Sequence, residues 1–230
     1  MLNSTSNLIS KRYEIFSINS VWLRRFLDLQ FDSIMHCFEL LVPSKNFKSI
    51  LDIGSGQSPY KNYFNNFDKF ESVDSDASMN ATYRSLNQIQ HQKYDLILLI
   101  ETLEHIADPQ TLLENIHALM KPNSELWISV PFAARYHPCP EDYYRWTSNG
   151  LKYLLEKNNF RIQKLLIRGN SLHTLVSKFN FLVFKYRPIS LIFLPVNILF
   201  IVLLKIFCRI ITSKETDPLG YFICAQIKRD

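Results

Sequence analysis

Short apolar runs alternate with amphipathic segments along most of this chain. Apolar runs of strand length occupy residues 49–53, 70–73, 94–100, 125–130, 160–168 and 220–228. Residues 109–120 and 148–158 instead repeat apolar side chains at intervals of three and four, which is typical of helices that cover one face of a sheet. Strands that alternate with helices predict right-handed crossovers and a mostly parallel sheet, so the expected fold class is α/β.

A separate helical pattern precedes the first strand. Residues 1–17 are polar and are expected to form an irregular arm. From Ser20 onward the apolar residues at helical spacing are Leu23, Phe26, Leu27, Ile34, Phe38 and Leu41. Pro43 ends the pattern, because proline cannot continue a helix. We expect one helix here, lying across a sheet edge or capping a pocket.

Roughly fifty residues that a minimal α/β fold does not need lie between the last two predicted strands. Residues 181–211 are strongly apolar, but the longest stretch without charge, 188–204, reaches only the short limit for a spanning helix. The basic residues that bracket it, placed to reach lipid headgroups, are Lys185, Arg187, Lys205 and Arg209. We expect a monotopic element or helical hairpin in one leaflet; the alternative is a helical pair packed on the domain or in a dimer interface.

These patterns divide the chain into four segments. They are an N-terminal arm and capping helix (1–46), a core (47–168), an apolar membrane-associating insertion (169–218) and the last core strand (219–230). The insertion interrupts the core, since the final strand returns to the same sheet. For that reason one short apolar stretch cannot cross a membrane and still leave the last strand in place.

Composition and charge narrow the possible partners. The chain has 230 residues, of which 47% are hydrophobic and 20% charged, and its net charge is +5. Nucleic-acid-binding proteins gather basic residues on one face, and no such run occurs here, so we expect no nucleic-acid partner. The four cysteines are widely spaced and the N-terminus lacks a secretory apolar core, which favours a cytoplasmic location, peripheral or monotopic at the membrane face.

The candidate cofactor site follows the first predicted strand. Asp52-x-Gly54-x-Gly56 forms a strand-to-helix turn, and Asp74 ends the next strand, where it can accept ribose hydroxyls. A dinucleotide site needs a third glycine close to Pro59, so a nicotinamide oxidoreductase is the weaker interpretation. An acid within the turn repels phosphate but suits a ligand with an amino group. S-adenosyl-L-methionine has a ribose and an α-amino acid tail and no phosphate.

The chain resembles the class I S-adenosylmethionine-dependent methyltransferases, in particular the type 11 group. The motifs that carry the resemblance are ILDIGSG at 50–56, SVDSD at 72–76, YDLILLIETLEHIADP at 94–109 and LWISVPF at 126–132. It implies a Rossmann-like seven-stranded sheet with helices on both faces and an antiparallel last strand. The residues that we assign to the cofactor on this basis are Asp52, Gly54, Ser55, Gly56, Asp74 and Glu101.

One departure from the family concerns the adenine contact. The family usually has an acid after its third strand, whereas the stretch ATYRSLNQIQHQ contains none. Either Asn87 or a backbone carbonyl replaces that acid, or the third strand is stunted. The adenine contact is therefore not assigned to a residue.

The acceptor side is expected at the carboxyl ends of the strands. Glu101 and His105 follow the strand at 94–100, and His137 opens a polar and aromatic loop, HPCPEDYYRWT. We take these three residues as catalytic candidates, because a hydroxyl acceptor needs a general base. The alternative is that Glu101 and His105 only shape the pocket and cap the helix that follows.

A metal-assisted site is a further alternative. Glu101, Glu104, His105 and His137 resemble the two Glu and two His that hold a divalent ion in the small-RNA 3′-end 2′-O-methyltransferases. The E-x-x-E-H pattern is also common in family members without a metal, so we assign no metal ligand from the sequence.

The predicted function is O-methylation of a small-molecule or lipid-linked acceptor close to a membrane, such as a glycan. The loop pattern H-x-x-P-x-D-Y-x-R-x-T is similar to loops in methyltransferases associated with surface-polysaccharide synthesis. The competing interpretations are methylation of RNA and a non-catalytic S-adenosylmethionine-binding scaffold held at the membrane through residues 181–211. Asp52 and Asp74 are both present, which disfavours the scaffold.

Overall fold

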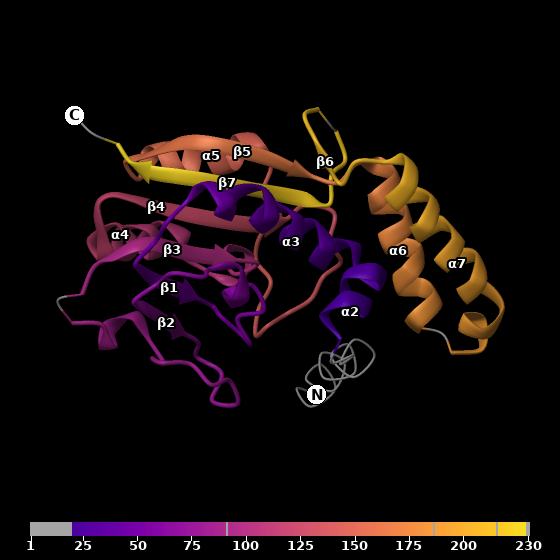
Figure 1. Cartoon of the computed structure of the whole chain (residues 1–230), viewed down its shortest axis with the longest axis horizontal. Coiled ribbons are helices and arrows are strands. Elements are labelled where there is room, and N and C mark those ends of the chain that lie inside the picture. The colour runs from indigo at the N-terminus through magenta and orange to yellow at the C-terminus, as the bar shows by residue number, and fades with distance from the viewer. Residues whose placement is uncertain (1–19, 91, 186, 215, 229–230) are drawn as a thin grey trace.

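The computed structural model describes residues 20–90, 92–185, 187–214 and 216–228, and in this part of the chain seven strands form one sheet. Their order across the sheet is β2-β1-β3-β4-β7-β5-β6 (Figure 1). The strands are β1 (Ser49–Ile53), β2 (Lys69–Val73), β3 (Tyr94–Ile100), β4 (Met120–Pro131), β5 (Phe160–Arg168), β6 (Ile211–Thr212) and β7 (Gly220–Ile227). The predicted irregular arm at 1–17 lies outside the described residues.

The strand directions confirm the predicted α/β fold and refine its sheet. The ladders β1–β2, β1–β3 and β3–β4 are parallel. Strand β7 pairs antiparallel with β4 and with β5, and β5 pairs antiparallel with β6. The mostly parallel description therefore holds for β1 to β4, and the antiparallel last strand that the resemblance implies is confirmed. The carboxyl ends of β1 to β5 meet at one edge of the sheet.

One of the seven strands, β6, was not predicted from the apolar pattern. It consists of Ile211 and Thr212 and forms one edge of the sheet inside the 169–218 insertion. At the opposite edge, the chain after β2 makes only a parallel bridge between Val73 and Tyr83. The family has a further strand in this stretch between β2 and β3. Here only the bridge remains, so that strand is stunted, which is one of the alternatives that the missing acid left open. The sheet of the described residues has seven strands, as the resemblance implies. It lacks a full strand beyond β2 at one edge and gains the short strand β6 at the other.

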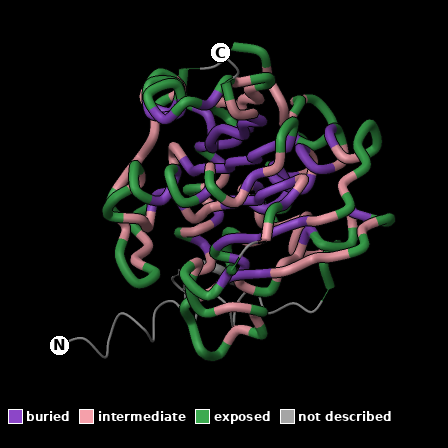
Figure 2. The backbone as a smooth tube through the Cα atoms, turned by 90° about the vertical axis from the view of Figure 1, so that its left-hand side faces the viewer, coloured by how far each residue is buried: buried purple, intermediate pink, exposed green. Residues whose placement is uncertain are grey.

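Helices cover both faces of the sheet, as predicted. Helix α3 (Leu29–Leu41) packs on one face, while α4 (Pro109–Leu119) and α5 (Ser148–Lys157) pack on the other. Alternate strand residues supply the two cores, because successive side chains of a strand point to opposite faces. Leu96 and Leu98 of β3 face α3, whereas Ile97 and Leu99 face α4 and α5. The buried residues accordingly follow the strands through the centre of the molecule (Figure 2).

The single N-terminal helix expected from Ser20 to Leu41 is wrong in two respects. It consists of α2 (Val21–Leu27) and α3, which are separated at Asp28. The Asp28 carboxylate accepts hydrogen bonds from Gln30 N and Phe31 N and so caps α3, which explains the break. Helix α3 lies over a sheet face instead of an edge, because its apolar side packs against β1, β3, β4 and β7.

The insertion is a pair of packed helices, which agrees with both interpretations of the sequence, the hairpin in a leaflet and the pair packed on the domain. Helices α6 (Ser171–Lys185) and α7 (Arg187–Phe207) pack side by side beyond the sheet edge at which the β5 arrow ends (Figure 1). A small apolar cluster ties them to the domain through Leu29, Val176, Ile201, Leu204 and Leu219. Among the described residues, no helix combines the length and apolar character needed to cross a membrane.

Candidate active site

The turn after β1 places its two glycines in different surroundings. Both have positive φ, 69° at Gly54 and 50° at Gly56, which favours glycine over residues with a side chain. A Cβ on Gly54 would lie 2.3 Å from Oγ1 of Thr102, so this glycine lets the loop after β3 pack on the turn. A Cβ on Gly56 would meet nothing within 4 Å. Gly56 therefore leaves the open side of the turn that a bound cofactor requires.

Asp74 lies at the tip of β2 and points back toward this turn. Its Oδ2 accepts a hydrogen bond of 2.7 Å from Gly56 N, and its Oδ1 accepts one of 2.9 Å from Asp76 N. The carboxylate is half-buried, and each oxygen keeps a second lone pair. Asp74 thus hydrogen-bonds to the glycine turn and stays partly accessible to solvent, while its predicted contact with a ribose stays a prediction.

Asp52 occupies a closed position beneath the turn. Its side chain is fully buried, and it accepts hydrogen bonds from Ser58 Oγ at 2.6 Å and Tyr60 OH at 3.3 Å. Burial raises the pKa of the Asp52 carboxyl to about 7, and the nearby Asp74 charge adds to this, while the two hydrogen bonds oppose it. Ser55, next in the turn, is buried and donates its amide to Val73 O. A direct cofactor contact of either side chain stays a prediction.

The raised pKa of Asp52 predicts a pH-dependent stability. An unfolded aspartate titrates near pH 4, so between about pH 4 and pH 7 the unfolded chain loses a proton that the folded one keeps. The free energy of unfolding should then fall as the pH rises through this window, by about 2–4 kcal/mol relative to Asp52→Asn, which cannot titrate. Urea denaturation of both proteins across that range measures the difference. Parallel stability curves would show that Asp52 is already ionised in the fold.

Glu101 is held rigidly at the end of β3. It has a positive φ of 52°, its amide donates to Ser129 O, and its Oε1 accepts from Ser129 Oγ at 2.9 Å. The same oxygen accepts a hydrogen bond of 2.8 Å from Nη2 of Arg168, a residue that is completely buried. Burial raises the pKa of Glu101, and the Arg168 charge opposes the shift. This arrangement fixes a carboxylate at the edge of the sheet where the predicted acceptor side lies.

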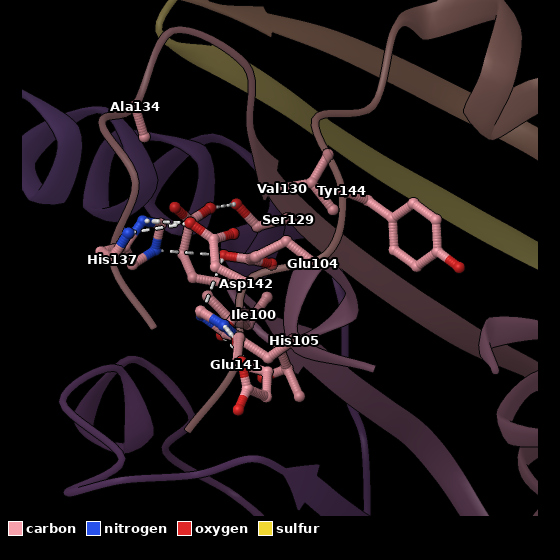
Figure 3. Close-up of polar contacts among 12 residues, drawn as sticks. Ile100, Glu104, His105, Ser129, Val130, Ala134, His137, Glu141, Asp142 and Tyr144 are labelled. Carbon is pink, nitrogen blue, oxygen red and sulfur yellow. Dashed lines mark hydrogen bonds and ion pairs between the residues drawn. The ribbon is translucent and has the colours of Figure 1, made fainter. Parts of the chain in front are cut away.

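Glu104, His105 and His137 come together at the carboxyl ends of the strands (Figure 3). Glu104 and His105 belong to the one-turn helix η4 (Leu103–His105), and His137 comes from the loop after β4. The Nε2 atoms of His105 and His137 lie 3.6 Å and 3.8 Å from the same oxygen, Oε1 of Glu104. Of the predicted catalytic residues, the structure thus gathers both histidines at Glu104, while Glu101 interacts electrostatically with Glu104 and His137.

The loop after β4 is closed over this cluster by backbone and ionic contacts. Tyr143 N donates a hydrogen bond of 2.8 Å to Glu104 O. Arg145 forms an ion pair with the buried carboxylate of Asp142. Burial alone would raise the pKa of Asp142, but the hydrogen bonds from Arg145 and from His137 N lower it. The Arg135 guanidinium of the same loop stacks on the Phe181 ring of α6 at 3.9 Å. The loop after β4, which also contains His137, therefore contacts the hairpin.

Several residues of this site escaped the sequence reasoning. Arg168 ends a strand directly before Gly169, and a lone basic residue at that point is an available signal for a buried ion pair. Gly220 gives a second signal, since its Cβ would lie 2.2 Å from the Arg168 guanidinium. Thr102 and Arg135 carry no comparable sequence signal, because their roles depend on which segments meet in the fold.

The sheet, the two-glycine turn and Asp74 together define a nucleotide-binding α/β fold whose ligand lies at the carboxyl ends of the strands. The profile of one protein family, described as a methyltransferase domain, matches residues 23–185. This chain belongs to that family and is a methyltransferase with S-adenosyl-L-methionine as its cofactor. The open face of Gly56 and the fixed carboxylate of Asp74 fit such a ligand.

Solved structures with the same fold are distant in sequence. An S-adenosylmethionine-dependent methyltransferase from Archaeoglobus fulgidus is 16% identical, with a TM-score of 0.53 over 84% of this chain and 92% of that one. Another from Clostridium acetobutylicum is 8% identical, with a TM-score of 0.51 over 97% of this chain and 99% of that one. At these identities the likeness concerns the fold alone.

Among curated proteins, the chain is similar to a ubiquinone biosynthesis O-methyltransferase of Coxiella burnetii. The two are 44% identical over 39 residues. This match spans 17% of the present chain and 17% of the relative. It therefore covers one short segment of each protein.

Proposed function

We propose that this methyltransferase acts on a hydroxyl group of a membrane-proximal or lipid-linked acceptor, such as a glycan, while the α6–α7 hairpin rests on the cytoplasmic face of a membrane. The observation that carries the proposal is the contact between Arg135 and Phe181. Through it, the loop that holds His137 over the acceptor side is joined to the apolar hairpin. An acceptor bound at the carboxyl ends of the strands would then lie close to the surface on which the hairpin rests.

The hairpin exposes an unusually apolar surface. Its exposed large apolar residues are Leu172, Leu175, Leu182, Ile192, Phe193, Val196, Ile198, Leu199, Phe200, Leu203, Ile206 and Phe207. An apolar groove of about 450 Å³ runs between the two helices. Soluble monomers rarely expose a contiguous apolar patch of this kind, and such patches mark membrane or protein contacts.

One part of the sequence-based membrane argument is wrong. Lys205 was expected to reach lipid headgroups, but its ammonium group pairs with Asp32 of α3 and donates to Arg25 O. Lys205 therefore fastens α7 to the N-terminal helices. The membrane proposal depends on the apolar surface and not on this lysine.

A hydroxyl acceptor agrees with the groups around the acceptor side. The cofactor supplies an electrophilic methyl group on a sulfonium. The acceptor oxygen would attack in line with the bond from sulfur to the methyl carbon; that bond breaks, the sulfur keeps its electrons, and the hydroxyl proton leaves. Glu101, His105 and His137 are the proposed groups that orient the hydroxyl and take up its proton. The O-methyltransferase similarity of one short segment supports the same acceptor class.

The membrane proposal predicts that two charges on the hairpin strongly weaken vesicle binding. Ile206 and Phe207 are 65% and 78% exposed, so Ile206→Glu with Phe207→Glu should leave the fold intact. Co-sedimentation with vesicles of phosphatidylcholine and phosphatidylglycerol should fall at least about tenfold, because two apolar contacts with lipid are replaced by charges. Tyr153→Glu on α5, a site that is 70% exposed, is the matched control and should bind as the wild type does.

Turnover separates an enzyme from a scaffold. Incubation with S-adenosylmethionine and a membrane lipid extract should yield S-adenosylhomocysteine and a methylated lipid-phase product. Cofactor binding without turnover on lipid, glycan or RNA extracts would favour the scaffold. Methylation of the RNA extract alone would contradict the proposed acceptor.

A further inference from the structure

We propose that Glu104, His105 and His137 bind one divalent transition-metal ion beside the site of methyl transfer. The sequence alone favoured a site without metal, and the juxtaposition of these three side chains reverses that preference. Their ligand atoms all lie within 4.8 Å of one another. The binding step stands on this geometry, while the catalytic use of the ion rests on the proposed methylation of a hydroxyl group.

The first observation concerns Glu104. Its side chain is fully buried, and among the described residues neither carboxylate oxygen has a hydrogen-bond partner. A buried carboxylate without hydrogen bonds is costly unless a cation lies against it. In this chain the carboxylate points between the two imidazole rings (Figure 3). A cation in that space would lie against Oε1, the oxygen that both Nε2 atoms face.

The second observation is the orientation of the two imidazoles. Nδ1 of His105 lies 2.6 Å from Glu141 O, and Nδ1 of His137 lies 2.8 Å from Arg135 O. A carbonyl oxygen only accepts, so each Nδ1 is placed to donate, although Nδ1 of His137 also lies 3.3 Å from Nη2 of Arg145. In the tautomer with Nδ1–H, each ring presents the lone pair of Nε2 to Glu104. A ring nitrogen bonded to a backbone carbonyl is the usual support of a metal-binding histidine.

The spacing favours an ion over a direct ion pair. Separations of 3.6 Å and 3.8 Å between Nε2 and Oε1 are too long for hydrogen bonds. Bonds of about 2.0–2.2 Å to a shared ion would place neighbouring ligand atoms about 3.0–3.5 Å apart. The ligand atoms, which lie within 4.8 Å of one another, would have to draw closer by rotation of the side chains to reach that spacing.

The ligand set indicates the class of metal and its use. Two imidazoles and one carboxylate suit Zn²⁺, Co²⁺ or Mn²⁺ better than Mg²⁺ or Ca²⁺, which prefer oxygen. Three protein ligands leave a position open for water or an acceptor oxygen. With both histidines bound to the ion, a hydroxyl bound there would pass its proton to Glu101, the remaining proposed base. Its oxygen would then bond to the methyl carbon as the sulfur–methyl bond breaks and the sulfur keeps the electrons.

The test is a titration of the full-length, chelator-treated protein with Co²⁺. We expect visible absorption bands of bound Co²⁺ that saturate at one ion per chain and disappear on competition with Zn²⁺. Glu104→Gln keeps the size of the side chain and removes its charge, so affinity should fall by about 100-fold or more. His137→Gln should weaken binding and alter the spectrum, since it replaces a nitrogen ligand.

Control variants and a stability readout make the outcome decisive. Glu114→Gln and His117→Gln on α4 change the same residue types away from the cluster and should bind Co²⁺ as the wild type does. Thermal unfolding should show a metal-dependent rise in Tm for the wild type and none for Glu104→Gln, which also reports whether the variant folds. Wild-type protein without stoichiometric binding, or unchanged affinity in Glu104→Gln, would overturn the proposal. Cofactor binding and methyl transfer are measured in separate experiments. If the protein binds no metal, these experiments still test the proposed function.

Discussion

Replacing Arg168 by methionine is expected to lower the free energy of unfolding by about 3 kcal/mol, because the substitution leaves the Glu101 carboxylate without its buried partner. Arg168 is completely buried, and Nη2 donates to both Glu101 Oε1 at 2.8 Å and Val130 O at 2.9 Å. Methionine fills much of the same volume but donates nothing. Urea denaturation at neutral pH measures the loss.

The same ion pair allows a sharper test through a double variant. Glu101→Gln removes the charge that Arg168 compensates, so Arg168→Met with Glu101→Gln should be less destabilised than the sum of the two single variants. Arg161→Met, on the exposed part of the same strand, is the control and should change stability by less than about 0.5 kcal/mol. Additive single effects would mean that Arg168 acts through packing alone.

Most strands of the sheet could be predicted from the sequence, because apolar residues recur at different intervals in buried strands and in amphipathic helices. Five of the predicted strands sit within a residue or two of β1, β2, β3, β5 and β7, and only β4 begins earlier than expected, at Met120. The break at Asp28 was missed because an aspartate on the polar side of a helical pattern reads equally well as helix interior or cap. The two residues of β6 are too few to carry a period at all.

The candidate site was predicted less completely, for a physical reason. Motif reasoning brought the glycine turn and Asp74 together, since adjacent parallel strands end at the same edge. It assigned both glycines to the cofactor and did not predict that Gly54 also leaves room for the side chain of Thr102. Glu104 lies near His137 only because the loop after β4 folds back. Backbone hydrogen bonds help to hold this loop, and no pattern of residue types predicts them.

Asp74→Asn is expected to weaken binding of S-adenosylmethionine by about 10- to 100-fold, the usual effect of losing charge-assisted hydrogen bonds. Gly56 N and Asp76 N already hold the two carboxylate oxygens, so the remaining lone pairs have fixed directions. These directions suit the two neighbouring hydroxyls of a ribose. An asparagine has one acceptor oxygen, and its NH₂ group would face a backbone amide or a ribose hydroxyl.

Asp76→Asn is the matched control for this experiment. Asp76 lies two residues further on, is exposed, and accepts hydrogen bonds from Ser78 N and Ser78 Oγ. Its change should alter cofactor affinity by no more than about threefold, since exposed polar contacts contribute little. Calorimetric titration with S-adenosylmethionine and S-adenosylhomocysteine measures both variants. Equal losses in the two variants would indicate a general charge effect, and no loss in Asp74→Asn would place the ribose elsewhere along the sheet edge.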